Sequence, residues 1–125
     1  MALVVAVDDE PDMLLLVERV LSREGHVVIA APDGVAALEA VRKHRPDLVI
    51  SDNQMPRMNG LDLCRSLRAD PEHAHVPVVI ASGSVCSDDP RLDEAGVTDT
   101  LPKPYRPGDL AAKVAQVLAL ALRAH

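Results

Sequence analysis

The chain has 125 residues and a formal net charge of -6 at pH 7. Hydrophobic residues make up 48% of it and aromatic residues only 1%, so a core must be built from aliphatic side chains. The length fits one domain, because single domains commonly run about 100–150 residues. The acidic balance argues against an isolated nucleic-acid-binding module, which needs a basic surface to meet phosphates.

Targeting and redox signals are absent from the sequence. Cys64 and Cys86 form no CxxC motif and no disulfide framework, so both are expected to be ordinary thiols. The apolar stretch 2–7 is too short for a signal peptide and runs straight into acidic residues. No apolar run approaches the roughly 20 residues of a membrane span. We therefore expect a cytoplasmic protein.

The first quarter of the chain predicts a strand, a helix and a second strand. Residues 3–7 are apolar and β-branched, which is typical of a strand buried on both faces. The acidic run 8–10 and Pro11 end this strand, and a helix follows, starting near Asp12 as its cap and ending at Gly25. Residues 27–30 then form a short second strand.

The middle of the chain repeats this alternation. Asp33-Gly34 begins a helix whose last turn carries the basic residues 42–44, where cations suit the helix dipole. A buried strand follows and ends at Asp52, after the apolar run 48–50. Residues 60–68 have helical spacing of apolar positions, which predicts the next helix.

The last part of the chain contains two further strands. Residues 76–81 predict a fourth buried strand, and Pro90 is expected in the first turn of a short helix that ends at Gly96. Residues 97–101 predict the last and weakest strand, and a closing helix opens at Pro107 or Asp109. Strands that alternate with helices predict one α/β domain with a parallel sheet covered on both sides, without an internal linker or low-complexity tract.

Polar residues follow four of the predicted strands. They are Asp8 and Asp9 after the first, Asp52 after the third, Ser82 after the fourth and Lys103 after the fifth. A parallel sheet brings these strand ends to one edge, where ligands bind in open α/β sheets. Three carboxylates close together repel one another unless a cation lies between them, and such oxygen ligands suit Mg²⁺. Together with a lysine and a hydroxyl, they suit phosphoryl transfer to a carboxylate.

The ordered motifs resemble the receiver domain of two-component response regulators. The resemblance rests on Val7-Asp8-Asp9-Glu10, Asp52-x-x-Met55-Pro56-x-Met58-x-Gly60, Ser82 and Lys103-Pro104. It covers essentially the whole chain, which is expected to be a single receiver domain over residues 1–125. It implies a doubly wound, flavodoxin-like three-layer sandwich with a five-stranded parallel sheet in the order 2-1-3-4-5.

The resemblance also implies a role for each site residue. Asp52 would be the phosphoacceptor, and Mg²⁺ (or Mn²⁺) would be held by Asp52, Asp9, the backbone carbonyl of Gln54 and, largely through water, Asp8. Lys103 would pair with the phosphoryl group.

The smaller contributions come from the loops beside these residues. The Ser82 hydroxyl would turn toward the bound phosphoryl group, and the backbone amides of Asn53 and Gly83 would help to cradle it. A cis bond is implied between Lys103 and Pro104, which is plausible because residue 104 is proline.

Two features depart from the family pattern. Thr100 stands where the family usually carries Tyr or Phe, a ring that changes rotamer and reports phosphorylation to the surface. We therefore expect phosphorylation to occur with altered coupling to the surface. The segment from Ser82 to Gly96 is short, which predicts a fourth helix of about two turns that starts late, after an extended loop over residues 83–89.

Other interpretations of these residues stay open at this stage. Asp52 could be a strand-end turn residue, Asp8 and Asp9 a helix cap, and Ser82 and Lys103 ordinary loop and surface groups. Four histidines, at positions 26, 44, 73 and 75, are expected on the surface.

Three functions are compatible with the pattern. The favoured one is a signalling switch, not a turnover enzyme, fed by a sensor histidine kinase or a histidine phosphotransfer protein. It would act through a downstream protein or an output domain outside this chain, without binding nucleic acid or membranes. A homodimer is compatible with this function. A degenerate receiver that only binds proteins is one alternative. A phosphatase with an aspartyl-phosphate intermediate is the other, although such enzymes typically carry a second acid where this chain has Gln54.

Overall fold

The computed structural model describes residues 2–55, 57–83 and 89–123, and within them strands and helices alternate strictly along the chain. The five strands are β1 (Leu3–Val7), β2 (Val27–Ala31), β3 (Leu48–Asp52), β4 (Val78–Ser82) and β5 (Asp99–Pro102). The five helices are α1 (Pro11–Arg23), α2 (Gly34–His44), α3 (Gly60–Ala69), α4 (Pro90–Ala95) and α5 (Pro107–Arg123).

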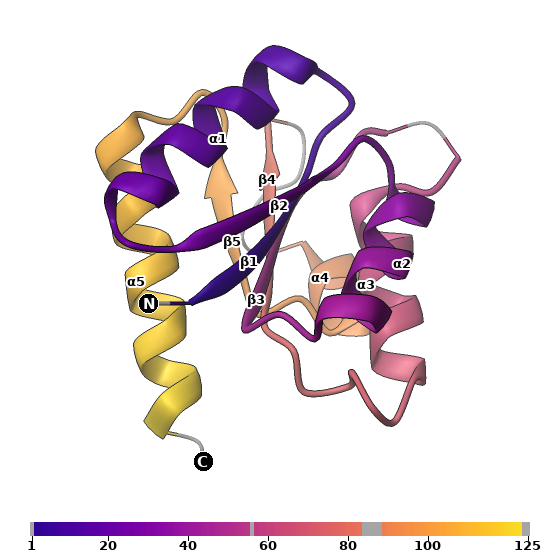
Figure 1. Cartoon of the computed structure of the whole chain (residues 1–125). Coiled ribbons are helices and arrows are strands. Elements are labelled where there is room, and N and C mark those ends of the chain that lie inside the picture. The colour runs from indigo at the N-terminus through magenta and orange to yellow at the C-terminus, as the bar shows by residue number, and fades with distance from the viewer. Residues whose placement is uncertain (1, 56, 84–88, 124–125) are drawn as a thin grey trace.

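The strands form one parallel sheet in the order β2-β1-β3-β4-β5, as expected. Figure 1 shows α1 and α5 on one face of this sheet and α2, α3 and α4 on the other, which makes three layers. All four strand pairs are parallel, so the carboxyl ends of the strands meet at one edge. In the register, Asp52 at the end of β3 lies beside Ala81 of β4.

Each face of the sheet covers its own aliphatic core. Toward α1 and α5 the core contains Val4, Ala6 and Ile50 from the strands, packed on helix residues such as Leu21 and Leu110. Toward α2, α3 and α4 the alternate strand residues pack on leucines and on Cys64, which is buried as an ordinary thiol. Cys86 lies outside the described residues. The central strands are buried on both faces, which explains why their sequences are continuous apolar runs.

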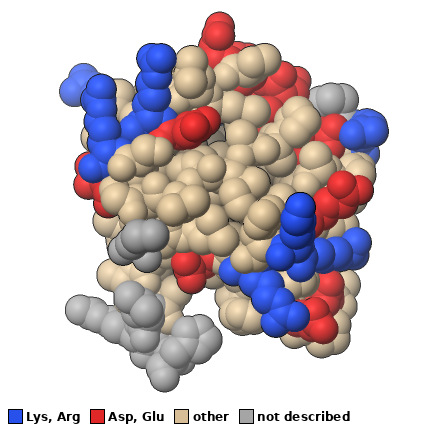
Figure 2. Space-filling view, in the orientation of Figure 1, with Lys and Arg blue, Asp and Glu red and all other residues tan. Residues whose placement is uncertain are grey.

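The edge strand β2 forms an uncharged stripe on the surface. Its sequence, VVIAA, contains no charged residue, and Val27 is 47% exposed. In the space-filling view, Lys, Arg, Asp and Glu side chains gather around the outside of a broad uncharged area (Figure 2). Within the described part of the chain β2 pairs only with β1, so this stripe is the open edge of the sheet.

Side-chain caps begin three of the helices. Asp33 accepts a hydrogen bond from the Ala36 amide at 2.8 Å, and Asn59 accepts one from the Asp62 amide at 2.8 Å. Asp89 likewise accepts from the Arg91 amide. Each cap satisfies a backbone donor that the helix itself leaves unpaired.

The helix α1 begins at Pro11, near the expected residue, but the expected cap was wrong. Glu10 rather than Asp12 precedes the helix, and it makes no capping side-chain bond. Proline is favoured at the first helical position because its fixed φ suits the helix and its missing amide hydrogen has no partner to lose there. Asp12 instead places a negative charge in the first helical turn.

Two strand boundaries also differ from the expectation. The fourth strand begins at Val78 and extends to Ser82, because residues 71–75 form turns before it. The fifth strand covers Asp99–Pro102 rather than residues 97–101. In both cases the predicted strand began in the two residues that link the preceding turn to the observed strand, 76–77 and 97–98.

His73 corrects the expectation that four histidines lie on the surface. It is only 3% exposed, whereas His44 and His75 are exposed and His26 is half-buried. The backbone amide of His73 donates to the Asp70 carbonyl at 3.0 Å, and its carbonyl accepts from the Val76 amide at 3.2 Å. These hydrogen bonds form the turn in which the His73 side chain is buried.

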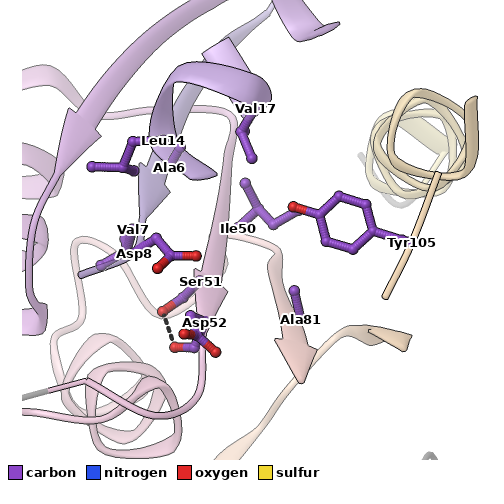
Figure 3. Close-up of a pocket in the computed structure, with 10 residues that line it drawn as sticks. All are labelled: Ala6, Val7, Asp8, Leu14, Val17, Ile50, Ser51, Asp52, Ala81 and Tyr105. Carbon is purple, nitrogen blue, oxygen red and sulfur yellow. Dashed lines mark hydrogen bonds between the residues drawn. The ribbon is translucent and has the colours of Figure 1, made fainter. Parts of the chain in front are cut away.

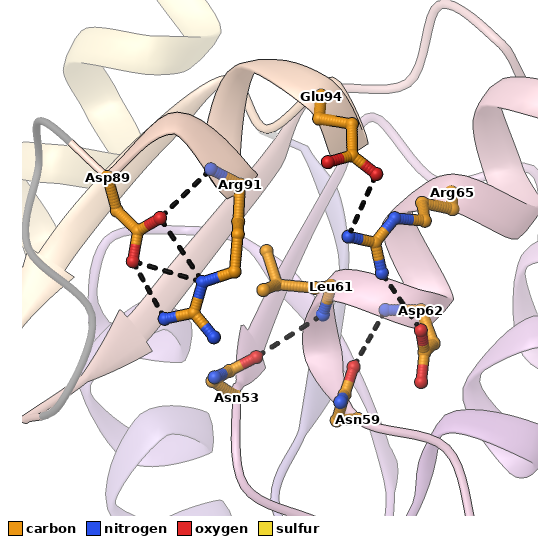
Figure 4. Close-up of polar contacts among 8 residues, drawn as sticks. All are labelled: Asn53, Asn59, Leu61, Asp62, Arg65, Asp89, Arg91 and Glu94. Atoms are coloured by element: carbon orange, nitrogen blue, oxygen red, sulfur yellow. Dashed lines mark hydrogen bonds and ion pairs between the residues drawn. The ribbon is translucent and has the colours of Figure 1, made fainter.

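The short fourth helix is confirmed. It has six residues, Pro90 at its first position and Gly96 at its left-handed C-cap with φ of 79°. Residues 84–88 of the expected extended loop lie outside the described residues. The helix packs on α3, where the Glu94 carboxylate lies 3.5 Å from the Arg65 guanidinium (Figure 4).

One arginine joins three segments at the edge of the sheet opposite the acidic strand ends. The Arg68 guanidinium donates to the carbonyls of Gly96 at 2.9 Å, Val76 at 2.7 Å and Ala74 at 3.2 Å. A further bond reaches the hydroxyl of Thr98 at 3.4 Å. The end of α3 is thereby fastened to the chain before β4 and to the α4–β5 turn.

Gly34 is required by close packing between α2 and the segment after β3. A Cβ at position 34 would lie 2.6 Å from the Met58 carbonyl oxygen and 2.7 Å from its Cβ. We expect Gly34→Ala to lower the free energy of unfolding by about 1–3 kcal/mol, because one of the two segments must move. Urea denaturation measures this, with Gly108→Ala as the control, since nothing lies within 4 Å of that added Cβ. Equal stabilities of the two variants would contradict the prediction.

Candidate functional site

Three carboxylates meet at the carboxyl edge of the sheet. Asp8 and Asp9 follow β1, Asp52 ends β3, and one carboxylate oxygen of each lies within 4.8 Å of the other two. Asp8 is buried, Asp52 is half-buried and Asp9 is exposed. The sequence predicted this convergence from the parallel sheet alone.

Asp8 is held in a position that disfavours its charge. Burial raises the pKa of its carboxyl group, and the nearby negative charge of Asp52 raises this pKa further. The Glu10 amide, which donates to Asp8 Oδ1 at 3.0 Å, and the positive charge of Lys103 oppose this rise. Ionisation of Asp8 therefore has a cost that an added cation would reduce.

Lys103 lies between two of the acids. Its Nζ is 3.4 Å from Asp8 Oδ2 and 3.5 Å from Asp52 Oδ2. The residue follows β5 directly, and its amide donates to the Ser82 carbonyl at 3.1 Å, which fixes it beside the end of β4. The expected cis bond between Lys103 and Pro104 is confirmed.

Ser82 is the last residue of β4 and is buried, 6% exposed. Its strand neighbour across the ladder is Pro102, immediately before Lys103. Ser82 is therefore at the same edge as the three acids, as predicted. Gly83 is also described here, whereas Ser84 lies outside the described residues.

The segment after Asp52 turns tightly back to α3. The Ser51 hydroxyl donates to the Asp52 carbonyl at 2.8 Å (Figure 3), and a Cβ on Gly60 would approach that same carbonyl oxygen to 2.7 Å. The Asn53 side chain accepts from the Leu61 amide at 3.3 Å (Figure 4). This side-chain contact was not predicted from the sequence, where Asn53 entered only through its backbone amide.

An ion pair fastens the same segment to α2. The Arg57 guanidinium lies 2.5 Å from Asp33 Oδ2, and the Ala36 amide and this arginine together lower the pKa of the Asp33 carboxyl group. Arg57 has a left-handed backbone with φ of 68°, as expected for a tight turn. Sequence reasoning assigned Asp33 only to the start of a helix, and no local motif would have revealed its partner 24 residues away.

Tyr105 is a second residue that the sequence reasoning missed. It is the only aromatic residue of the chain, and it lines a small cavity together with Asp8 and Asp52. Burial, and then the charges of Asp8 and Asp52, raise the pKa of its hydroxyl group to about 12. The sequence did offer one signal for this residue, because Tyr105 is the single aromatic ring in a protein with an aliphatic core.

The raised pKa of Tyr105 makes stability depend on pH in the alkaline range. Below the ordinary pKa of 10.0 both the folded and the unfolded chain keep the phenolic proton. Between that value and about 12 only the unfolded chain loses it, so the contribution of Tyr105 to folding falls as the pH rises. We expect tyrosinate absorbance, measured in chelator, to show a higher midpoint for the native protein than in denaturant. Coincident midpoints would contradict this.

The donor set fits a hard divalent cation. It consists of carboxylate oxygens, one of them on a buried acid whose charge is disfavoured without a counter-ion. Such all-oxygen sites with exposed positions left for water suit Mg²⁺ better than softer transition metals. The acids of this chain could therefore hold the ion that phosphoryl transfer requires.

Comparison with known proteins agrees with this geometry. The family model for the response regulator receiver domain matches residues 4–115. The chain belongs to this family. The chemotaxis response regulator CheY4 of Vibrio cholerae superposes with a TM-score of 0.89 at 30% identity, over 94% of this chain and 98% of that one. The receiver domain of a histidine kinase from Syntrophus aciditrophicus gives 0.85 at 30% identity, over 95% and 91%.

Curated relatives include longer response regulators. The DNA-binding response regulator MtrA of Mycolicibacterium smegmatis is 41% identical over 112 residues, which are 89% of this chain and 48% of the relative. The response regulator MprA of Mycobacterium leprae is 40% identical over 115 residues, 92% of this chain and 50% of the relative. This receiver chain thus spans about half the length of these relatives.

The membership establishes the coarse function. The chain is a receiver domain of two-component response regulators, with an acidic cluster where the family binds its metal. Within the described residues, no helix has both the length and the apolar character that crossing a bilayer requires. The doubly wound fold, the strand order and the resemblance drawn from the motifs are confirmed.

Proposed function

We propose that this receiver accepts a phosphoryl group on Asp52 and thereby switches between two signalling states. The observation that carries the proposal is the position of Lys103, whose Nζ lies 3.4 Å from Asp8 and 3.5 Å from Asp52. A single cation shared by two of three crowded carboxylates is an arrangement suited to a doubly charged group that arrives between them.

The reaction assigns one task to each residue. A carboxylate oxygen of Asp52 attacks the phosphorus of the donor, and the bond from phosphorus to the donor's leaving atom breaks, so an acyl phosphate forms. Lys103 neutralises charge on the transferring group, and the Ser82 hydroxyl donates to one of its oxygens. Asp8, Asp9, Asp52 and the Gln54 carbonyl would hold Mg²⁺, which supplies further charge neutralisation when bound.

The donor would be a sensor histidine kinase or a histidine phosphotransfer protein. The receiver assists its own phosphorylation and dephosphorylation but is not a turnover enzyme. The 1–125 chain forms one receiver domain in the cytoplasm, and its state is read by a downstream protein or by an output domain; the longer relative MtrA is named as DNA-binding.

A test is incubation with Mg²⁺ and acetyl phosphate, followed by intact-mass analysis and peptide mapping. We expect one phosphoryl adduct on the peptide that contains Asp52, lost after hydroxylamine treatment because acyl phosphates react with this nucleophile. The same incubation with a chelator is the control and should give no adduct. An adduct that forms without Mg²⁺, maps elsewhere or never forms would contradict the proposal.

One observation favours a second candidate, a receiver that binds partners without switching. Thr100 stands in β5 where the family usually carries an aromatic ring, and its amide donates to the adjacent Asp99 carboxylate at 2.8 Å. The acids and Lys103 are all present, however, which a receiver without phosphorylation would not require. We therefore retain phosphorylation and expect altered coupling to the surface.

A further inference from the structure

The single aromatic residue of the chain lines a small cavity that Asp8 and Asp52 also line. This cavity has a volume of about 10 Å³ and is lined by Asp8, Asp52, Val17, Ile50 and Tyr105, among others. Figure 3 shows the ring entering from the segment before α5 and pointing toward Ile50. The ring therefore packs against the same strands that end in Asp8 and Asp52.

Tyr105 also lines a groove on the surface. The groove has a volume of about 380 Å³ and lies between the start of α1 and the segment that joins β5 to α5. It is lined by Glu10, Met13, Leu16, Lys103, Pro104 and Tyr105. Tyr105 is the residue that these two linings share, so it lies between the cavity beside the acids and the groove.

The ring is connected to the site through both proximity and chain. Lys103, which lies between Asp8 and Asp52, precedes Tyr105 by two residues, so a displacement of its backbone is passed on to the ring. Asp8 and Asp52 line the same small cavity as Tyr105, so a group added to Asp52 lies close to this residue. No hydrogen bond to another described residue anchors the Tyr105 hydroxyl, so a rotation of the ring breaks none there.

We propose that Tyr105 is the residue that couples the state of Asp52 to the surface, by an outward displacement of its ring into the groove beside α1. The inference rests on the proposed phosphorylation of Asp52 and names the route by which that event leaves the site. Thr100 lacks a ring, and Tyr105 supplies one from a different segment and toward the opposite face of the sheet, against α1 rather than α4.

The direction of the displacement follows from the available space. The cavity of about 10 Å³ has no room for a deeper position of the ring, whereas the groove of about 380 Å³ does. A phosphoryl group on Asp52 adds negative charge beside Lys103 and draws its Nζ away from Asp8. Closely packed side chains pass such a displacement on to their neighbours. The Tyr105 ring therefore moves toward the groove.

Intrinsic fluorescence tests the proposal directly, because Tyr105 is the only tyrosine and the chain has no tryptophan. Acrylamide quenching is measured on the full chain alone, with Mg²⁺, and with Mg²⁺ and beryllofluoride as a phosphoryl mimic. We expect a roughly twofold larger quenching constant in the last state, since the ring population shifts toward the groove. Intact-mass analysis of an acetyl phosphate reaction is run in parallel to record adduct formation on Asp52.

Variants separate this role from simple packing. Hydrogen exchange of the α1 start is compared with and without phosphorylation, at the same fraction of adduct, in Tyr105→Phe, Tyr105→Leu and Thr100→Ala. We expect Phe and the Thr100 variant to retain the phosphorylation-dependent change at α1 and Leu to lose it. Should Tyr105→Leu fail to fold, the quenching experiment on the unaltered chain decides.

The outcomes distinguish this inference from the proposed function. An adduct on Asp52 with unchanged Tyr105 quenching overturns the coupling role and leaves phosphorylation standing. Retained coupling in Tyr105→Leu, or loss of coupling in Thr100→Ala, overturns it as well. Failure to form any adduct overturns both proposals.

Discussion

Asparagine in place of Asp52 will leave a folded protein that forms no detectable phosphoryl adduct with Mg²⁺ and acetyl phosphate. The amide keeps the size of the side chain at the end of β3 but lacks the anionic oxygen that attacks phosphorus. The variant should fold, because the substitution removes one of three carboxylates that lie within 4.8 Å of one another and so lowers their repulsion. Intact-mass analysis measures the adduct, and circular dichroism measures the fold.

A matched control is Asp62→Asn. Asp62 is an exposed carboxylate in the first turn of α3, where it pairs with Arg65 at 3.0 Å. This variant should form the adduct as the unaltered chain does. A full-strength adduct in Asp52→Asn, or equal loss in both variants, would show that another residue accepts the phosphoryl group or that the loss has a general cause.

Asp8→Asn should have two opposite effects, higher stability without metal and loss of stabilisation by Mg²⁺. Burial and the charge of Asp52 raise the pKa of the Asp8 carboxyl group, so at neutral pH its ionised form opposes folding. Asparagine removes this charge and keeps an oxygen that can accept from the Glu10 amide, as Asp8 Oδ1 does at 3.0 Å. We expect the free energy of unfolding to rise by about 1 kcal/mol, or the melting temperature by several degrees.

Thermal melts with and without Mg²⁺ measure both effects of Asp8→Asn. The unaltered chain should melt at a higher temperature with Mg²⁺, since a ligand that binds only the folded state stabilises it. The variant should show little change on adding Mg²⁺. Lower stability in chelator, or an undiminished response to Mg²⁺, would contradict the reading of Asp8 as a metal ligand held against its own charge.

Strand placement and site convergence could be predicted from the sequence because both depend on local pattern. Runs such as 48–50, with Asp52 two residues after their end, indicate a buried strand and the point where it leaves the sheet. Because the strands are parallel, Asp8, Asp52 and Lys103 must then lie at the same end of the sheet, although the pattern does not give the distances between them. The structure supplies those distances, about 3.5 Å from Lys103 to each acid.

The boundaries and the long-range contacts could not be predicted in this way. The helix α1 begins at Pro11, and Asp12 is not its cap, because proline is favoured at the first helical position. The spacing of apolar residues does not reveal this preference. The burial of His73 depends on two turn hydrogen bonds, and the Asp33–Arg57 pair joins loops that are distant in the chain. Tyr105 was not singled out from the sequence because no motif or residue spacing marks it. Its importance comes from its position between the cavity and the groove.

The contacts of Arg68 restrict which mutations this protein can tolerate. A single guanidinium, with its fixed fork of donors, serves Gly96, Val76, Ala74 and Thr98 at once. Lysine carries the same charge on a point-like ammonium group and cannot satisfy such widely spread acceptors together, so the conventional conservative exchange would orphan backbone carbonyls. Substitutions of Arg68 are therefore expected to be poorly tolerated, although this residue lies at the opposite end of the strands from the acidic site.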